Sequence, residues 1–295
     1  MSAMRSAAHL IVGSRDEPFL APLLESMSGA VDALIVNDNS DGPSPHEETL
    51  RASWFGRTGR LFVDRSPFAD FSTARNRCLD LHARIGGGPW AAFVDADEVH
   101  GEAFGRIARN LDAVPESYDF VDAYTWHFFA SFDLYTSIER RMAFFRVKPG
   151  ARWEGPVHEQ LRGLDGRRLA LPYVYAHYGH VLPPRRHAEK GRQYAGLGQI
   201  GEVVPEESLD AIDPAVYFRS IWPTVLRFTG QHPPAVRAVV AELRQECARE
   251  QARAADLAGA AQPPLVRARN IALKLNYEQR WRSRFANPLA RRLLR

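Results

Sequence analysis

Lysine, cysteine and long apolar runs are scarce in this 295-residue chain. Lysine occurs only at positions 148, 190 and 274, so arginine carries most of the positive charge, and the formal net charge is only +3. So small a net charge argues against an electrostatic nucleic-acid binder, and we expect no nucleic acid among the partners.

Three further absences concern the compartment. No apolar stretch is long enough to cross a bilayer, and residues 1–9 lack the apolar core of a signal peptide. The two cysteines, Cys78 and Cys247, lie far apart and form no C-x-x-C motif. Such sparse cysteine usage favours a reducing compartment, so we expect a cytoplasmic protein.

Two nucleotide-binding motifs are also missing. No G-x-G-x-x-G sequence follows the first apolar segment, which argues against a dinucleotide-binding Rossmann site. No G-x-x-x-x-G-K sequence occurs anywhere, which excludes a P-loop.

The first half of the chain alternates short apolar segments with helical patterns. We expect strands at residues 10–12, 33–36, 61–63 and 91–94. Helices are expected over residues 16–27, 70–81 and 103–111, with Asp16 capping the first and Asp70 or Ser72 the second. This alternation predicts an α/β fold, a mostly parallel sheet with helices on both faces.

Longer aromatic strands follow over residues 118–147 and 168–175. Tyr124, Trp126 and Phe128 alternate onto one face, where they suit a core better than an acceptor sugar. Beyond Pro183-Pro184 the pattern turns helical, with helices expected at 188–200, 235–254 and 265–276. We therefore predict two domains, residues 1–182 and a helical C-terminal extension, residues 183–295.

The end of the chain mixes arginines with apolar side chains. The arginines are at positions 280, 282, 284, 291, 292 and 295, and the apolar residues are Trp281, Phe285, Leu289, Leu293 and Leu294. This mixture suits a basic amphipathic helix in peripheral contact with the inner membrane surface. A solvated tail or a subunit contact explains it equally well.

The segment AAFVDADEV at residues 91–99 is the most informative in the chain. An apolar strand runs directly into Asp95, Asp97 and Glu98, and like charges this close raise one another's pKa. A hard cation such as Mg²⁺ or Mn²⁺ relieves that repulsion, and open α/β sheets bind ligands at such strand ends. A solvated turn that caps the next helix is the simpler alternative.

Five motifs occur in a fixed order along the chain. They are NDNS at 37–40, FSTARN at 71–76, DADE at 95–98, GPVHEQL at 155–161 and AHYGH at 176–180. Together they resemble family 2 glycosyltransferases of the GT-A fold, in particular bacterial enzymes related to lipopolysaccharide-core β-glucosyltransferases. The resemblance covers roughly residues 8–195 and implies a GT-A domain, Rossmann-like with helices on both faces.

The resemblance also implies an activity and site residues. It implies transfer of a sugar from a nucleotide-diphosphate donor, with a UDP-sugar expected, to a glycan, glycolipid or small-molecule hydroxyl. Asp97 would bind Mn²⁺ or Mg²⁺, with His177 as a further ligand. Asp95 would contact the ribose or the waters of the ion, Asp38 the base, and Arg75 the nucleotide.

An inverting transfer needs a base that takes the proton of the acceptor hydroxyl, and a carboxylate can serve. Glu159, beside His158, is the first candidate, with Glu154 and Glu98 behind it. Alternatively, Glu159 orients His158 or pairs with a nearby arginine such as Arg141 or Arg146.

Two other functions remain open at this point. A metallohydrolase would gather its ligands from Asp95, Asp97, His158, Glu159, His177 and His180, although no H-x-H or H-E-x-x-H spacing is present. A non-catalytic scaffold would keep the fold and dock through its arginine-rich end.

Overall fold

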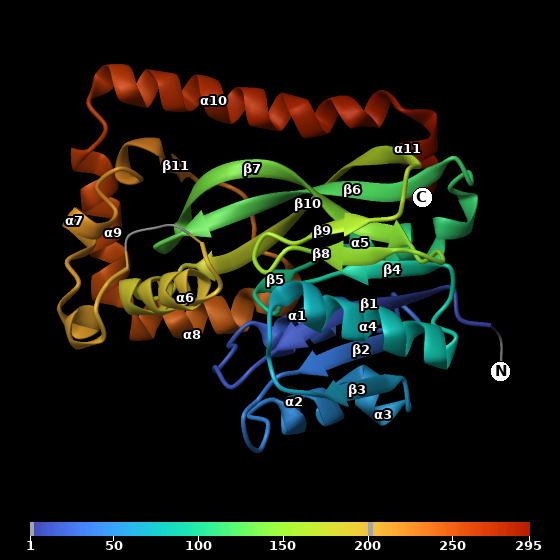
Figure 1. Ribbon diagram of the computed structural model, residues 1–295. Helices are drawn as coiled ribbons and strands as arrows, with labels where there is room; N and C mark the ends of the chain where they lie inside the picture. Colours follow the sequence, from blue (N-terminus) through green and yellow to red (C-terminus); the bar gives the residue numbers. More distant parts are fainter. Residues whose placement is uncertain (1–2, 200–202) are drawn as a thin grey trace.

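The computed structural model describes residues 3–199 and 203–295 and has an α/β architecture built around one large sheet (Figure 1). The described residues form nine strands of this sheet in the order β3-β2-β1-β4-β7-β6-β10-β5, with β11 paired to β7. The first four strands in space are parallel: β3 (Leu61–Arg65), β2 (Ala33–Asp38), β1 (Ser6–Val12) and β4 (Trp90–Phe93).

Antiparallel pairing begins where β4 meets the long strand β7 (Ser131–Arg146). β7 pairs antiparallel with β6 (Tyr118–Phe129), which runs parallel to β10 (Arg167–His180). The short strands β5 (Glu98–Val99) and β11 (Leu226–Arg227) complete the sheet, and β8 (Arg152–Glu154) and β9 (Gln160–Arg162) form a separate hairpin. The predicted fold class is confirmed.

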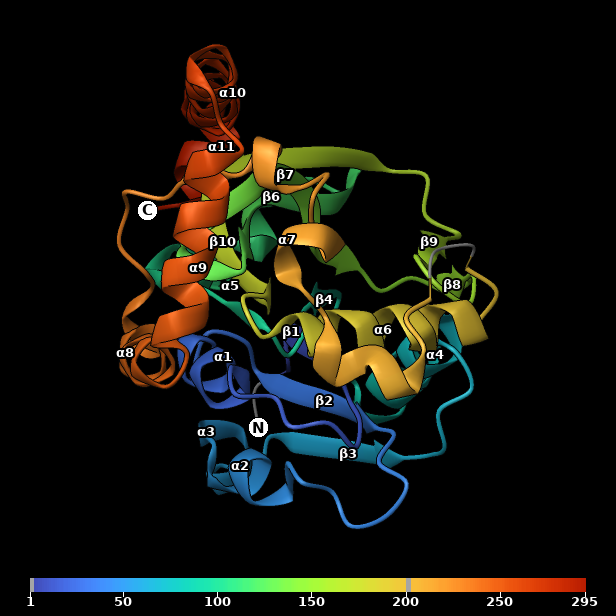
Figure 2. The same ribbon diagram turned by 90° about the vertical axis from the view of Figure 1, so that its left-hand side faces the viewer.

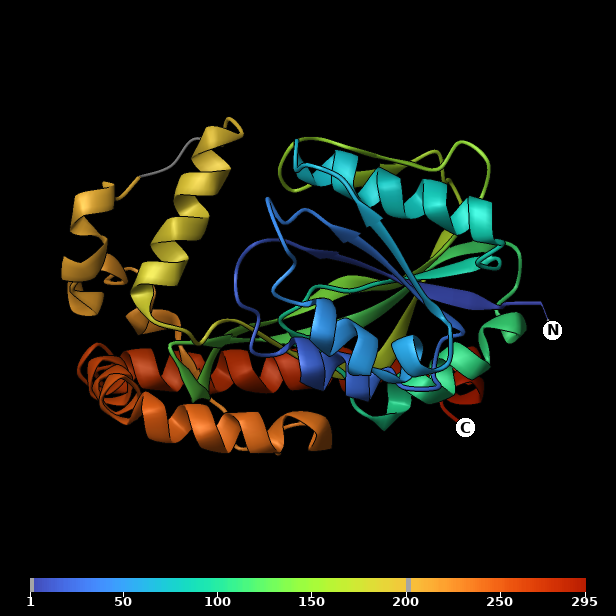
Figure 3. The ribbon, with the colours of Figure 1, turned by 90° about the horizontal axis from the view of Figure 1, so that it is seen from below.

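Helices cover both faces of the parallel part, as Figure 3 shows from below. On one face α4 (Phe71–Ile85) packs Cys78 against Ala7 and Ile35 of the strands. On the other face α1 (Leu20–Ser26), α3 (Trp54–Arg57) and α5 (Glu102–Arg109) contribute to the main core, and α2 (Glu47–Ala52) adds one buried leucine. Burial on both faces explains why β1, β2 and β4 are largely apolar runs, whereas β3 at the edge of the sheet is partly exposed.

The start of α1 differs from the expectation. The helix begins at Leu20, with Phe19 rather than Asp16 at the N-cap. Pro22 delays the helix, because proline is tolerated only in a first turn and Pro22 falls within the first turn of α1. Asp16 lies instead in the preceding loop, where its carbonyl oxygen accepts a hydrogen bond from Arg186.

The C-terminal part consists of α6 (Pro184–Gly196), α7 (Pro214–Tyr217), α8 (Arg237–Glu246), α9 (Ala248–Ala260), α10 (Pro264–Arg282) and α11 (Pro288–Leu293). Residue 200, the expected end of the first helix here, lies outside the described residues. The single helix expected at 235–254 is wrong, because the chain breaks at Cys247 into α8 and α9. The break lets Val240 and Ala254 pack into two different apolar clusters.

Tyr124 and Phe128 are buried beneath these C-terminal helices, so the interpretation of this aromatic face as core is confirmed. Figure 2 shows α10 projecting from the rest of the molecule beyond β7. No helix in the described ranges combines the length and apolarity needed to cross a membrane.

The contact of the C-terminal tail with a membrane stays a prediction, and only part of the apolar side of the tail remains free for it, since Phe285 is exposed. Leu293 is completely buried in the main core, Leu289 and Leu294 pack against that core, and Trp281 packs on a neighbouring cluster. Four of the five apolar side chains of the predicted tail therefore pack within the protein, and Phe285 is 48% exposed. Residues of the predicted extension thus contribute to the core of the predicted first domain.

Candidate active site

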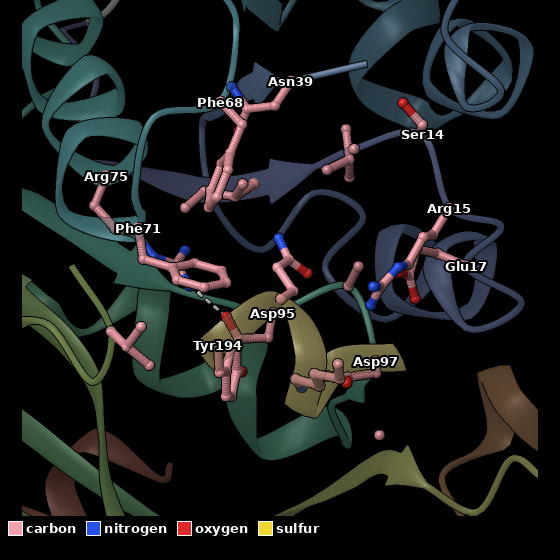
Figure 4. Close-up of a pocket in the computed structure, with 18 of the residues that line it drawn as sticks. Ser14, Arg15, Glu17, Asn39, Phe68, Phe71, Arg75, Asp95, Asp97 and Tyr194 are labelled. Atoms are coloured by element: carbon pink, nitrogen blue, oxygen red, sulfur yellow. Dashed lines mark hydrogen bonds and ion pairs between the residues drawn. The ribbon is translucent and has the colours of Figure 1, made fainter. Parts of the chain in front are cut away.

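A pocket of about 820 Å³ opens beyond the carboxyl ends of β1 and β4. Its walls come from the loops after β1, β2 and β4, the start of α4, the turn at 157–159, and α6. Figure 4 shows Asp95 near Phe71 and Tyr194, with Asp97 on the side of Arg15 and Glu17. The pocket thus lies where an open α/β sheet is expected to bind a ligand.

The start of α4, with the N-cap Asp70 and the FSTARN motif, is fixed to the segment that contains Trp153. Asp70 caps α4 by accepting a hydrogen bond of 2.7 Å from the backbone N–H of Thr73. One turn later, the Asn76 amide donates to the carbonyl of Trp153 and accepts from its N–H, both at 2.9 Å. The N-terminal end of α4 therefore fixes the segment that leads into Glu159.

Arg75 is the centre of a buried ion-pair network. Its guanidinium contacts the Asp95 carboxylate, lies 3.3 Å from Glu159 Oε1 and sits 4.1 Å from the Phe93 ring centroid. Burial lowers the pKa of Arg75, but the two carboxylates outweigh it and the pKa is raised. For Asp95, burial raises the pKa, but the charges of Arg75 and Arg141 outweigh burial. The pKa of Asp95 is therefore lowered, and its carboxyl stays ionised.

The three candidate bases have different surroundings. Glu98 is fully buried and pairs with Arg141 at 3.2 Å; burial and then Asp95 raise its pKa to about 7. Glu154 is exposed on β8. Glu159 is the one of these three that lines the pocket, and its arginine partner is Arg75 rather than the expected Arg141 or Arg146.

The residue before Glu159 carries backbone strain. His158 has a φ of 54°, in the left-handed region that residues other than glycine rarely adopt. Its ring lies 6.0 Å from that of Tyr194 on α6. Strain of this kind persists where the surrounding structure fixes it and is common at functional sites.

Asp97 lines the pocket and forms a close pair with His177, which is buried behind it and is not a lining residue. Oδ1 of Asp97 lies 3.3 Å from Nε2 of His177, which projects from β10. Burial raises the pKa of Asp97, but His177 more than offsets this, and the pKa is lowered well below its usual range. Conversely, burial lowers the pKa of His177 and Asp97 raises it, with a net increase.

This pair fits a divalent cation. Carboxylate oxygen and imidazole nitrogen are acceptable ligands for Mn²⁺, and adjacent ligands of an octahedral ion lie about 3 Å apart. Gly179 borders both donors, because a Cβ there would collide with Oδ2 of Asp97 and lie 2.9 Å from Cε1 of His177. The glycine therefore leaves a space at the two donors that any side chain would fill.

A larger ligand set is not assembled. Across residues 3–199 and 203–295, no group of three or more His, Cys, Asp or Glu residues is arranged to hold a metal ion. The six residues that a metallohydrolase would need therefore do not form a metal-binding group, and two of the carboxylates, Asp95 and Glu159, are paired with Arg75.

Asp38 lies at the end of β2 beside the pocket but is not one of its lining residues. Its carboxylate accepts hydrogen bonds from the N–H and hydroxyl of Ser40, at 3.0 and 2.6 Å. Its neighbours Asn39 and Asp41 line the pocket instead. A contact between Asp38 and a nucleotide base stays a prediction.

Sequence reasoning missed the contribution of α6. One face of this helix lines the pocket with Arg186, Lys190, Gln193 and Tyr194. Burial lowers the pKa of Lys190, but Asp97 outweighs it and the pKa is raised, so the ammonium is charged. The helical spacing of these polar residues, on a chain with three lysines, was the available signal.

Glu17, in the loop after β1, was also missed. It lines the pocket, and burial followed by the nearby Asp97 raises the pKa of its carboxyl to about 7. No motif marks it, because its environment depends on residues far away in the sequence, including Lys190 and Arg186.

Comparison with known proteins gives distant similarities. No protein-family model matches the chain, and no curated protein matches it. Among solved structures, it is similar to TarS 1–349 from S. aureus, with 14% identity, 95% of this chain and 92% of that chain covered, and a TM-score of 0.40. It is also similar to the mannosyltransferase PcManGT from Pyrobaculum calidifontis, in complex with GDP-Man and Mn²⁺. The identity is 14%, 99% of this chain and 86% of that chain are covered, and the TM-score is 0.45.

A shorter similarity is to GalNAc-T7 with UDP, GalNAc and Mn²⁺, at 12% identity over 41% of this chain and 24% of that chain, with a TM-score of 0.32. All three TM-scores are below 0.5. The fold described above therefore rests on the topology of this chain itself.

Proposed function

We propose that this protein is a metal-dependent glycosyltransferase that moves a sugar, with inversion, from a UDP-sugar to a hydroxyl of a glycan, glycolipid or small-molecule acceptor. One observation carries the proposal. Asp97, paired with the buried His177 and bordered by Gly179, lines a pocket of about 820 Å³ to which α6 contributes Arg186 and Lys190. This arrangement suits a nucleotide diphosphate held by both a cation and basic side chains.

In this proposal Asp97 and His177 hold Mn²⁺ or Mg²⁺. The bound cation would neutralise the negative charge that develops on the departing diphosphate. Lys190 and Arg186 add fixed positive charge from α6, where they can bind diphosphate oxygens. The cation and the two side chains of α6 together would provide positive charge for the leaving group.

The remaining roles follow from the ion-pair network. Arg75 holds Asp95 at the strand exit, where the carboxylate is available to the ribose or to waters of the ion. Asp38 contacts the base from the end of β2. Glu159 takes the proton of the acceptor hydroxyl, and its contact with Arg75 fixes its position in the pocket.

The test combines ligand binding with one substitution. We expect UDP with Mn²⁺ to raise the thermal unfolding temperature of the wild-type protein, because a ligand that binds only the folded state stabilises it. Asp97→Asn should abolish the Mn²⁺-dependent part of that increase and abolish sugar transfer. Asp133→Asn is the matched control, because Asp133 pairs with Arg244 outside the pocket.

Two results would contradict the proposal. One is the absence of stabilisation by UDP or any other nucleoside diphosphate with Mn²⁺. The other is wild-type transfer and unchanged Mn²⁺ dependence in Asp97→Asn. Stabilisation by Zn²⁺ without nucleotide would favour the metallohydrolase instead.

A further inference from the structure

The two ring nitrogens of His177 face different partners. Nε2 lies 3.3 Å from Asp97 Oδ1, and Nδ1 lies 3.2 Å from Nδ1 of His127. The second contact follows from the register of the sheet, because His127 on β6 and His177 on β10 are direct neighbours in their parallel pairing. Their ring centroids are 4.8 Å apart, and both side chains are largely buried.

A contact between two Nδ1 atoms requires one donor and one acceptor. For Nε2 of His177 to bind a cation through its lone pair, the proton of the ring must lie on Nδ1. His177 therefore donates and His127 accepts. The proton of a neutral His127 then lies on Nε2, which is 3.5 Å from Oε2 of Glu139 on β7 and has no hydrogen-bond partner among the described residues.

We propose that His127 is a positioning residue that holds His177 in the tautomer and ring orientation in which Nε2 faces the cation beside Asp97. This inference rests on the proposed function, since it assigns a role toward the same metal. It adds a residue that lies outside the sequence motifs and does not line the pocket. Groups that orient metal-ligating histidines commonly affect metal affinity 10- to 100-fold.

The chain offers an internal comparison for this arrangement. His9 and His82 form another buried pair, with Nε2 of His9 2.9 Å from Nδ1 of His82. There the second nitrogen of His82 lies 2.8 Å from the carbonyl oxygen of Gly88, and neither histidine lines the pocket. Loss of this pair should reduce stability without an effect on a cation at Asp97.

The experiment compares three variants of the full chain, with Mn²⁺ affinity measured by electron paramagnetic resonance of free Mn²⁺ at saturating UDP. We expect His127→Leu to weaken Mn²⁺ binding roughly 10- to 100-fold. His127→Asn should restore most of the affinity, because its amide oxygen can accept the proton of His177. His82→Leu should bind Mn²⁺ as the wild type does.

A second readout needs no substitution. In wild-type protein with UDP and Mg²⁺, the ¹⁵N chemical shifts of the rings should show His177 protonated on Nδ1 and His127 on Nε2. Protonation of His127 on Nδ1 would overturn the inference, and so would wild-type Mn²⁺ affinity in His127→Leu. Equal losses in His127→Asn and His127→Leu would also overturn it, since packing alone would then explain the effect.

The proposed metal site can fail separately from this inference. Asp97→Asn, measured in the same way, should lose most of its Mn²⁺ affinity. If Asp97→Asn binds Mn²⁺ normally, the metal assignment itself is wrong. If Asp97→Asn loses affinity and His127→Leu does not, the metal site stands and only the role of His127 is refuted.

Discussion

At the scale of single residues, the assignment of the base depends on two carboxylates in one pocket. Glu159 is held by Arg75, whereas Glu17 has a pKa raised to about 7 by burial and by Asp97. A base is most effective when its pKa lies near the working pH, which makes Glu17 a serious competitor. The two residues lie far apart in the sequence and on different loops, so each can be substituted without a change in the other.

We predict that Glu159→Gln lowers turnover by roughly two to four orders of magnitude, the usual contribution of general base catalysis. Glutamine keeps the size of the side chain and can still accept a hydrogen bond from Arg75, but it cannot take up the acceptor proton. Affinity for UDP and Mn²⁺ should stay near that of the wild type. Turnover and calorimetric UDP affinity on the same variant check this.

Glu17→Gln is the comparison for that experiment. Near-normal turnover in Glu159→Gln together with collapse in Glu17→Gln would transfer the role to Glu17. In that case the wild-type rate should rise as the pH passes upward through about 7, because the ionised carboxylate is the form that accepts a proton.

Single residues also show what the sequence could predict about the site. Asp95, Asp97, Arg75 and Glu159 all line the pocket, because strand exits and helix starts are local features that motifs reveal. Asp38 does not line it, since its carboxylate binds Ser40, and no local pattern distinguishes these two uses of an aspartate. Glu17 owes its environment to distant residues and could not be found this way.

At the scale of elements, α6 is the part of the site that connects the two predicted domains. Arg15 donates to the carbonyl of Glu189 at 3.3 Å, and Arg186 donates to that of Asp16. The rings of Tyr194 and Phe71 lie 5.6 Å apart. The helix thus bridges the loop after β1 and the start of α4, and closes the pocket between them.

We predict that Lys190→Ala weakens binding of UDP roughly 10- to 100-fold, because a hydrogen bond to a charged group contributes about 1.5–3 kcal/mol. Calorimetric titration with UDP and Mn²⁺ measures the change. Arg192→Ala is the matched control, because Arg192 belongs to the same helix but pairs with Glu206 outside the pocket. Equal UDP affinity in Lys190→Ala and wild type would remove α6 from the diphosphate site.

Helices could be predicted from the sequence where one side of the helix is apolar and capping residues mark its two ends. α4 has Asp70 at its start and Gly86, with a φ of 64°, at its end. The break between α8 and α9 was missed because Cys247 is neither glycine nor proline. The break arises from tertiary packing, because α8 and α9 pack against different apolar clusters.

At the scale of the whole molecule, the C-terminal end completes the core of the sheet domain. Asn110, after α5, donates to the carbonyl of Leu293, and Ala290 and Leu293 are fully buried. Sequence alone could not predict this, because an amphipathic arginine-rich segment looks the same whether its apolar side meets lipid, a partner or its own protein. For Ala290 and Leu293 the three-dimensional arrangement shows contact with the core of their own protein.

Burial also gives the molecule a common electrostatic property. Among the described residues, seven histidines have a lowered pKa, and burial is the largest cause for each. They are His9, His82, His100, His127, His180, His187 and His232. On unfolding, each imidazole regains an ordinary pKa near 6.5, so the unfolded chain takes up more protons in mild acid.

We predict that the free energy of unfolding falls between pH 7 and pH 5. His100 tests the cause, because burial alone lowers its pKa to about 3 and it lies outside the pocket. Its contribution is full above pH 6.5 and lost as the pH falls toward 3, which amounts to roughly 2 kcal/mol at pH 5. His100→Gln should therefore lose roughly 2 kcal/mol less than the wild type between pH 7 and pH 5 in urea unfolding. An unchanged pH dependence in His100→Gln would contradict the prediction.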